Sequence, residues 1–102
     1  MVHPPCIGYT IIFTGEANKD LRRLEKQIIS KIFEKTRELT SSKLDSLNIK
    51  KLKSKSSLYR LRVGDYRVVY CIKYEKIIVY VVAVGHRKDI YDILDRRLIK
   101  MF

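Results

Sequence analysis

Residues 58–72, LYRLRVGDYRVVYCI, predict a β-hairpin. In residues 58–63 apolar and basic side chains alternate, which is the pattern of a strand with one buried face. The pair Gly64-Asp65 suits the tight turn of a hairpin, and residues 66–72 are rich in the β-branched and aromatic side chains of a returning strand. The hairpin therefore presents aliphatic side chains on one face and basic side chains on the other.

The basic face of this hairpin carries three arginines. Arg60 and Arg62 are two residues apart, so their Cα atoms lie ~7 Å apart on one face of the strand. Arg67 alternates with Tyr66 and Val68, which belong with the buried set, so we expect Arg67 on the same open face. One arginine alone is well explained as a stem laid over the sheet. Three together repel one another by about 1 kcal/mol per close pair even in water, and therefore predict a phosphate site.

The segments outside the hairpin supply further strands and a helical region. Residues 9–13 predict a strand, and residues 77–84, which are apolar on both faces, predict a central strand with a layer on each side. Between them, apolar residues at spacings of three and four run from Ala17 past Leu39, with Thr14 as the N-cap. This pattern fits one long helix or two helices in a hairpin equally well.

These elements make up an α+β domain. Residues 40–55 predict a helix end followed by a surface loop, and residues 88–98 predict a short C-terminal helix. The order is a strand, a helical segment, a three-stranded antiparallel meander and a short helix, with the helices packed on one face of a four-stranded, mainly antiparallel sheet. A chain of 102 residues has room for one such core, so we expect a single domain over residues 1–102, with residues 1–7 as a short leader.

The formal net charge of +11 predicts a polyanionic partner. Residues 1–45 hold eight Lys and Arg against six Asp and Glu, whereas residues 46–102 hold fourteen against five. The stretch 46–64 contains no acidic residue, and we expect four of its lysines to bind RNA: Lys50, Lys51, Lys53 and Lys55. An acidic protein or an anionic membrane surface would satisfy the charge as well, and a solvated loop would explain any single lysine.

Several other site classes have no support in the sequence. The two cysteines, Cys6 and Cys71, have no neighbouring Cys or His at metal-ligand spacing, so we expect no metal site, no disulfide framework and no cofactor. No apolar run reaches the ~18 residues of a membrane span, and the first five residues do not resemble a secretory signal. We therefore expect a cytoplasmic protein.

A second group of polar residues follows the central strand. His86 and Arg87 come directly after Gly85, and Tyr91 lies four residues beyond Arg87, on the same face if a helix has begun. Side chains at the end of a strand are commonly exposed to ligands. Taken alone, His86 is more typical of a turn residue than of a functional site. Tyr91 is as typical of a helix residue packed on the sheet edge as of a site residue.

Three motifs stand in order along the chain: Tyr59-Arg60-Leu61-Arg62, Gly64-Asp65-Tyr66-Arg67 and Gly85-His86-Arg87, followed by Tyr91. In this set the chain resembles the RelE superfamily of toxins from type II toxin–antitoxin systems. The resemblance covers nearly the whole chain and implies that the helical segment is two antiparallel helices. It also implies an mRNA interferase, a metal-independent endoribonuclease that cuts messenger RNA on the ribosome and inhibits translation. Such a toxin is restrained by a RelB-like antitoxin, for which we expect an acidic amphipathic segment.

The resemblance also implies the site residues. In the superfamily's pattern, two basic residues on the second strand, an arginine on the third, an arginine after the fourth and a tyrosine near the C-terminus form the catalytic site. Those positions fall on Arg60, Arg62, Arg67, Arg87 and Tyr91. At positions 60 and 62 this chain has arginine where the best-known members have lysine. Arginine is a poor general base because its pKa lies above ~12. We therefore expect His86 to act as the base, because histidine ordinarily titrates near neutrality.

Two other functions fit the same sequence. Relatives of the ParE branch share the fold, poison DNA gyrase and lack this arginine set, so the five matched residues favour the nuclease. A noncatalytic RNA-binding module would need the basic charge alone.

Overall fold

The computed structural model describes residues 3–52 and 57–101, with the backbone alone for residues 98–101. Its helices and strands follow one another along the chain as β1 (Thr10–Phe13), α1 (Gly15–Arg22), α2 (Lys26–Glu38), β2 (Ile49–Lys51), β3 (Leu58–Val63), β4 (Tyr66–Lys73), β5 (Ile78–His86) and α3 (Ile90–Met101). Two 3-10 turns, η1 (Leu44–Ser46) and η2 (Tyr74–Lys76), complete the set. The α+β class and the hairpin β3–β4 agree with the sequence-based prediction.

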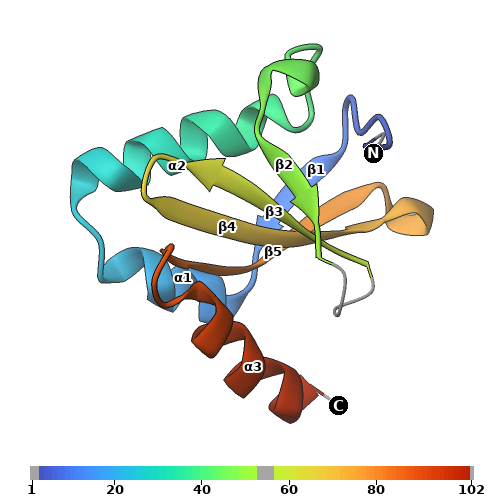
Figure 1. The fold of residues 1–102 in the computed structure, drawn as a ribbon. Helices are drawn as coiled ribbons and strands as arrows, with labels where there is room; N and C mark the ends of the chain where they lie inside the picture. The colour runs from blue at the N-terminus through green and yellow to red at the C-terminus, as the bar shows by residue number, and fades with distance from the viewer. Residues whose placement is uncertain (1–2, 53–56, 102) are drawn as a thin grey trace.

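The strands form one five-stranded sheet in the order β1-β5-β4-β3-β2 (Figure 1). Strand β1 runs parallel to β5, and the other neighbours are antiparallel. The sequence predicted four strands and placed a surface loop where β2 lies. Strand β2 has three residues, Ile-Lys-Lys, which is too short and too basic to show the alternation of a strand. Its pairing with β3, where Ile49 lies opposite Leu61, adds the fifth strand.

The helical region consists of two helices, α1 and α2, as the family resemblance implied. Helix α1 begins after Thr14, whose hydroxyl accepts a hydrogen bond from the backbone N–H of Ala17 at 3.2 Å, as expected for an N-cap. Both helices pack on one face of the sheet. The core between them contains the buried side chains of Ala17, Leu21, Ile32, Leu39, Leu61, Val68, Tyr70, Val79 and Val81.

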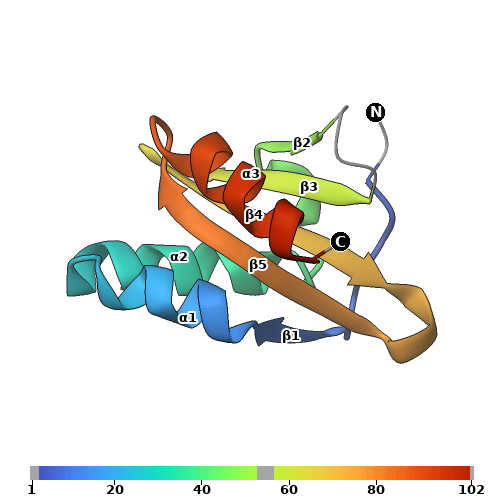
Figure 2. The ribbon, with the colours of Figure 1, turned by 90° about the horizontal axis from the view of Figure 1, so that it is seen from below.

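Helix α3 lies on the other face, which corrects the prediction that all helices share one face (Figure 2). Its Ile90 and Leu94 are buried in a second cluster with Val69 and Ala83 of the sheet. The cause is visible in β5, whose side chains are apolar on both faces and therefore need a cover on each side. Gly85 lies under this helix, where an added Cβ atom would come within 2.9 Å of the Ile93 side chain.

An ion pair joins α1 to α3 around the edge of β5. Strand β1 pairs only with residues 78–81 of β5, so the backbone beyond Val81 has no strand on that side. There the buried Asp20 carboxylate accepts a hydrogen bond from the Val84 N–H at 2.9 Å, while Arg97 donates to the Val82 carbonyl at 2.9 Å. Arg97 also donates to the two carboxylate oxygens of Asp20, at 2.5 and 2.7 Å. We call this pair the Asp20–Arg97 brace.

Ile77, just before β5, has a left-handed backbone with φ of 57°. A β-branched residue is strained in this region, and its side chain is 55% exposed, so little burial offsets the strain. We expect Ile77→Asn to stabilise the protein by about 1 kcal/mol and to raise the melting temperature by roughly 4–8 °C. Ile12→Asn, in extended β1, is the control and should bring no gain. An unchanged or lowered melting temperature for Ile77→Asn would contradict the assigned strain.

His3 holds the N-terminal segment to the sheet. Its Nδ1 lies 2.7 Å from the Pro4 carbonyl, which can only accept, so Nδ1 carries the proton and Nε2 accepts from the Tyr70 hydroxyl at 2.8 Å. Burial lowers the pKa of His3 below its ordinary value of 6.5, because the charged ring is poorly solvated there. Since the unfolded chain binds the proton more tightly, His3 should make the folded state progressively less stable as the pH falls below about 6.5.

This dependence is measurable by urea unfolding at several pH values between neutral and mildly acidic. The wild-type protein is expected to lose more stability over this range than His3→Gln, which cannot titrate. Equal losses in the two proteins would show that His3 does not contribute.

Candidate nucleic-acid interface

The three arginines of the hairpin lie on the same face of the sheet. Arg62 on β3 and Arg67 on β4 are direct cross-strand partners, and Gly85 on β5 is the next neighbour in the row. Directly paired residues project to the same side of a sheet. We call this the Arg62–Arg67 row. It lies on the face that α3 covers in part, because Gly85 is the residue that packs under that helix.

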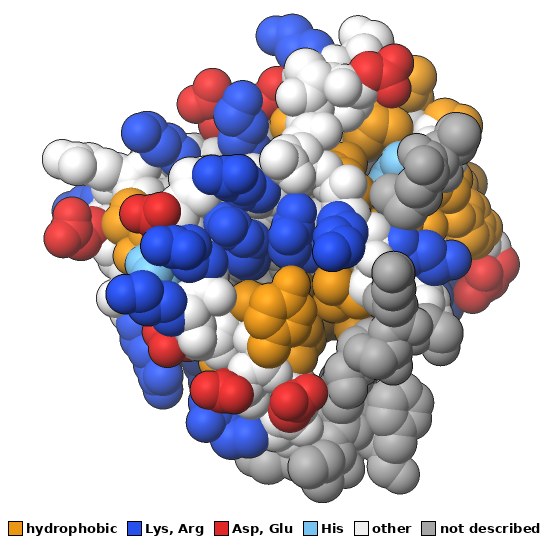
Figure 3. Space-filling view, in the orientation of Figure 1, with side chains coloured by type: hydrophobic (Ala, Val, Ile, Leu, Met, Phe, Trp, Pro, Cys, Tyr) orange, Lys and Arg blue, Asp and Glu red, His pale blue; other side chains and the backbone are white. Residues whose placement is uncertain are grey.

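A second basic row lies beside the first. Lys50 on β2 is the cross-strand partner of Arg60 on β3, and Arg60 in turn is opposite Val69, which belongs to the cluster under α3. We call this the Lys50–Arg60 row. The two rows together with Arg87 form the basic band, which therefore consists of Lys50, Arg60, Arg62, Arg67 and Arg87. Figure 3 shows Lys and Arg side chains gathered across the middle of this face, with a hydrophobic patch beside them.

Arg67 lies at the electrostatic centre of the basic band. Its pKa is held below the ordinary value of arginine, first by burial and then by the positive charges of Arg60, Arg62 and Arg87. One guanidinium nitrogen donates to the carbonyls of Gly64 at 2.8 Å and Tyr66 at 3.0 Å, which ties the side chain to the hairpin turn. Asp65 pairs with Arg87, and an anion bound here would relieve the repulsion that remains among the other arginines.

Arg87 is placed by the same turn. Its backbone N–H donates to the Asp65 carbonyl at 2.7 Å, and its Nε lies 3.7 Å from an Asp65 carboxylate oxygen. Both side chains are exposed, so this ion pair orients Arg87 but adds little to stability. The hairpin turn therefore holds two arginines of the band, one through Gly64 and one through Asp65.

Tyr91 borders the band from the first turn of α3. Its side chain is 51% exposed, and it interacts electrostatically with Arg67. An exposed aromatic ring beside clustered guanidinium groups is a suitable surface for stacking an RNA base. The structure thus brings Arg60, Arg62, Arg67, Arg87 and Tyr91 together, as the sequence predicted. That these residues catalyse a reaction stays a prediction.

His86 does not join this group. It is the cross-strand partner of Tyr66, whose side chain packs against the core on the α1–α2 face, and the two rings meet edge to face at 5.4 Å. Its Nδ1 accepts a hydrogen bond from the Lys88 N–H at 3.2 Å. A histidine on the opposite face of the sheet is poorly placed to take a proton from a ligand on the band, so the expected role of His86 as the base has no geometric support.

The four lysines predicted to bind RNA have different positions. Lys50 belongs to the band, whereas Lys51 is opposite Tyr59 and so lies on the α1–α2 face. Lys53 and Lys55 lie outside the described residues. Asn48 was not predicted as a site residue, but its side-chain oxygen accepts a hydrogen bond from an Arg60 terminal nitrogen at 3.1 Å. No sequence pattern indicated Asn48, because the neighbouring strand β2 was not predicted.

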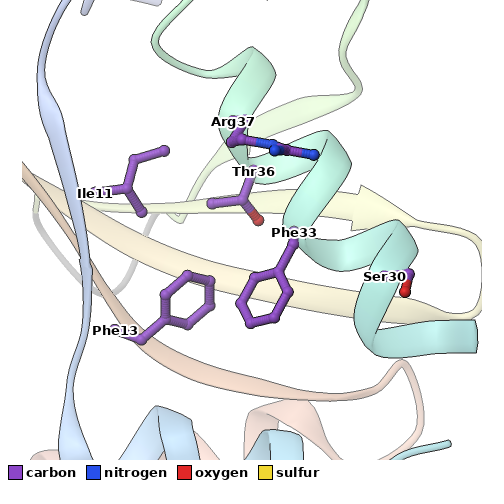
Figure 4. Close-up of a pocket in the computed structure, with 6 residues that line it drawn as sticks. All are labelled: Ile11, Phe13, Ser30, Phe33, Thr36 and Arg37. Carbon is purple, nitrogen blue, oxygen red and sulfur yellow. The ribbon is translucent and has the colours of Figure 1, made fainter. Parts of the chain in front are cut away.

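Away from the band, an apolar pocket of about 450 Å³ lies between β1 and α2 (Figure 4). Phe13 and Phe33 meet edge to face in it, with ring centroids 5.3 Å apart, and Arg37 lies at its rim. The pocket holds no pair of groups suited to acid–base chemistry. Its lining predicts contact with apolar side chains.

Two further observations concern the described part of the chain. Residues 3–52 and 57–101 contain no group of three His, Cys, Asp or Glu side chains placed to hold a metal ion. None of the helices formed by these residues has the length and apolar character needed to cross a bilayer.

Comparison with known proteins supplies the family. The family model described as the ParE toxin of type II toxin-antitoxin system, parDE, matches residues 11–91. Toxin RelE3 of Methanocaldococcus jannaschii is 35% identical over 85 residues, which cover 80% of this chain and 94% of the relative.

Solved structures agree with these matches. The RelB-RelE antitoxin-toxin complex from Methanococcus jannaschii matches with a TM-score of 0.66 and 31% identity, covering 79% of this chain and 95% of that one. The isolated E. coli RelE toxin matches with a TM-score of 0.63 and 26% identity, covering 89% and 99%.

Proposed function

The chain belongs to the RelE superfamily of type II toxin–antitoxin toxins, and from this membership we propose that it is an endoribonuclease that cuts messenger RNA on the ribosome and so inhibits translation. The observation that carries the proposal is the basic band with Tyr91 beside it. Four arginines lie on one face of the sheet, two on β3, one on β4 and one at the end of β5. Neither a gyrase poison nor a purely structural sheet needs such a cluster. A scissile phosphodiester supplies the missing counter-charge.

The proposed reaction needs no group beyond RNA and the protein. The ribose 2′-oxygen attacks the adjacent phosphorus and loses its proton, the bond from phosphorus to the 5′-oxygen breaks, and the 5′-oxygen takes up a proton. The products are a 2′,3′-cyclic phosphate and a 5′-hydroxyl end. Arg67 and Arg87 suit the stabilisation of the extra negative charge on phosphorus, because planar guanidinium groups match phosphoryl oxygens. Tyr91 can stack on a base or relay a proton.

The partner that restrains this activity is proposed to be a RelB-like antitoxin. Two solved relatives are complexes of this kind, the RelB-RelE complex from Methanococcus jannaschii and the intact E. coli RelBE complex. A net charge of +11 favours an acidic amphipathic segment as the inhibitor, because it would cover the band and neutralise it. The toxin would then act in the cytoplasm, where messenger RNA and ribosomes are found.

Gyrase inhibition is the second candidate, because the matching family model carries the name of the ParE toxin. Pulsed expression of the chain followed by mapping of transcript ends separates the candidates. New ends inside translated messages are expected for the nuclease. DNA breakage without such ends would favour gyrase inhibition over the nuclease. If neither effect is seen, a noncatalytic RNA-binding module is the remaining candidate.

A further inference from the structure

The two rows of the basic band are offset along the strands by two residues. Arg60 and Arg62 belong to different rows and lie on the same face of β3, so their Cα atoms are about 7 Å apart. This distance is comparable to the separation of successive phosphates along an RNA strand. The regular repeat of the sheet therefore sets two groups of cations at the pitch of a nucleic-acid backbone.

The Lys50–Arg60 row offers hydrogen-bond donors for a phosphate. Lys50 is exposed on the edge strand β2, next to Arg60 on β3. Asn48 holds one terminal nitrogen of Arg60, which fixes the plane of the guanidinium group. The Nε atom of Arg60 is buried and has no hydrogen-bond partner among the described residues. Because Nε has almost no exposed surface, a phosphate would bind Lys50 and the terminal guanidinium nitrogens of Arg60.

The Arg62–Arg67 row has a different arrangement. One terminal nitrogen of Arg67 is committed to the carbonyls of the hairpin turn, and Arg62 is exposed beside it. Arg87 adds its charge to this row from the end of β5. The residues proposed to stabilise the reacting phosphate thus gather around Arg67, whereas Lys50 and Arg60 lie one row away.

We propose that Lys50 and Arg60 form a second phosphate subsite, which binds the phosphate next to the scissile one in the same RNA strand. The proposal rests on the proposed function, since it assumes that the Arg62–Arg67 row holds RNA. It assigns to Lys50 and Arg60 the alignment of the strand, and to the Arg62–Arg67 row the phosphate that reacts.

The test uses two short probes and measures their affinity as a function of salt. The first is a 2′-O-methyl trinucleotide with two internal phosphates and no terminal phosphate, which cannot be cleaved because its 2′-oxygens are blocked. The second is the same molecule with one neutral methylphosphonate linkage. Each phosphate held in a subsite contributes about −0.7 to the slope of log K against log salt for a single strand. Wild-type protein should therefore show slopes of about −1.4 and about −0.7 with the two probes.

The variant Lys50→Ala/Arg60→Gln is expected to give a slope of about −0.7 with both probes, because only one subsite is left. The matched control is Lys51→Ala/Arg22→Gln, which removes the same charge from exposed positions on β2 and α1. It should behave as the wild type does. Equal slopes for the two variants would overturn the proposal, because net charge alone would then explain binding.

Binding of the trinucleotide and cleavage of messages are measured separately, so each result tests a different claim. If the trinucleotide does not bind wild-type protein at low salt, the phosphate subsite is refuted, and an acidic protein becomes the better ligand for Lys50 and Arg60. Cleavage of translated messages in cells would still support the nuclease in that case. Absence of cleavage together with the expected slopes would refute the nuclease and leave the two-phosphate site intact.

Discussion

Arg67→Ala is expected to abolish growth arrest on expression and to lower the rate of message cleavage by about 10²–10³-fold. Arg67 is the residue on which the other charges of the basic band converge, and it is held to the turn by two hydrogen bonds. Removal of a donor aimed at charge that develops in the transition state has effects of this size. The measurement is the frequency of new transcript ends inside translated messages after a short pulse of expression.

The control for Arg67→Ala is Lys51→Ala, a loss of one positive charge on the opposite face of the sheet. Lys51→Ala should keep both growth arrest and cleavage. Melting temperatures of the purified variants distinguish loss of a functional group from loss of the fold, because the hydrogen bonds of Arg67 are exposed or partly buried and contribute only modestly to stability. Full cleavage by a folded Arg67→Ala protein would count against the nuclease site.

Asp20→Ala is expected to lower the free energy of unfolding by about 2–4 kcal/mol and the melting temperature by roughly 10–20 °C. The carboxylate is 7% exposed and accepts hydrogen bonds from both Arg97 and the Val84 N–H. Its loss leaves the buried Val84 N–H of β5 without a partner and the Arg97 guanidinium group without its counter-charge. Thermal unfolding followed by circular dichroism gives the comparison.

Glu16→Gln serves as the matched control for Asp20→Ala, because Glu16 also contacts Arg97, at 3.8 Å, but is 59% exposed. An exposed pair of this kind contributes about 0.5 kcal/mol or less, so the control should melt close to the wild type. If Asp20→Ala melted no lower than Glu16→Gln, the Asp20–Arg97 brace would not be a stabilising feature. Arg97→Ala should resemble Asp20→Ala, since it leaves the buried carboxylate uncompensated.

The parts of the fold that depend on local patterns were predictable from the sequence. The alternation in residues 58–63 and the Gly64-Asp65 pair specify the hairpin, and alternation alone places Arg60, Arg62 and Arg67 on one face. The N-cap at Thr14 was predictable for the same reason, because a cap acts within one helical turn.

Features that depend on distant contacts were not predictable in this way. Strand β2 exists through its pairing with β3, and the Asp20–Arg97 brace joins residues that are far apart in the sequence. The side taken by α3 depends on the space left after α1 and α2 have covered the other face. Periodicity within a segment carries no information about the first two, and the apolar pattern of β5 requires a cover on each face without showing which helix supplies it.

The position of His86 shows how a single irregularity changes a site. Val69 pairs with Ala83 and Tyr70 with Val81, so β5 carries one extra residue at this point. Val79 and Val81 face α1 and α2, so strict alternation along β5 would place His86 on the opposite face, with the basic band. The extra residue reverses the count, so His86 faces Tyr66 instead.

The brace also has a consequence for self-association. The outer edge of β5 beyond Val81 is not covered by β1, and free backbone groups on a sheet edge are a template for strands of other molecules. Here the Val84 N–H and the Val82 carbonyl are already bonded to Asp20 and Arg97. A strand from a second copy would have to displace both side chains before it could extend the sheet, so this edge is closed to fibre-like growth while α1 and α3 stay in place.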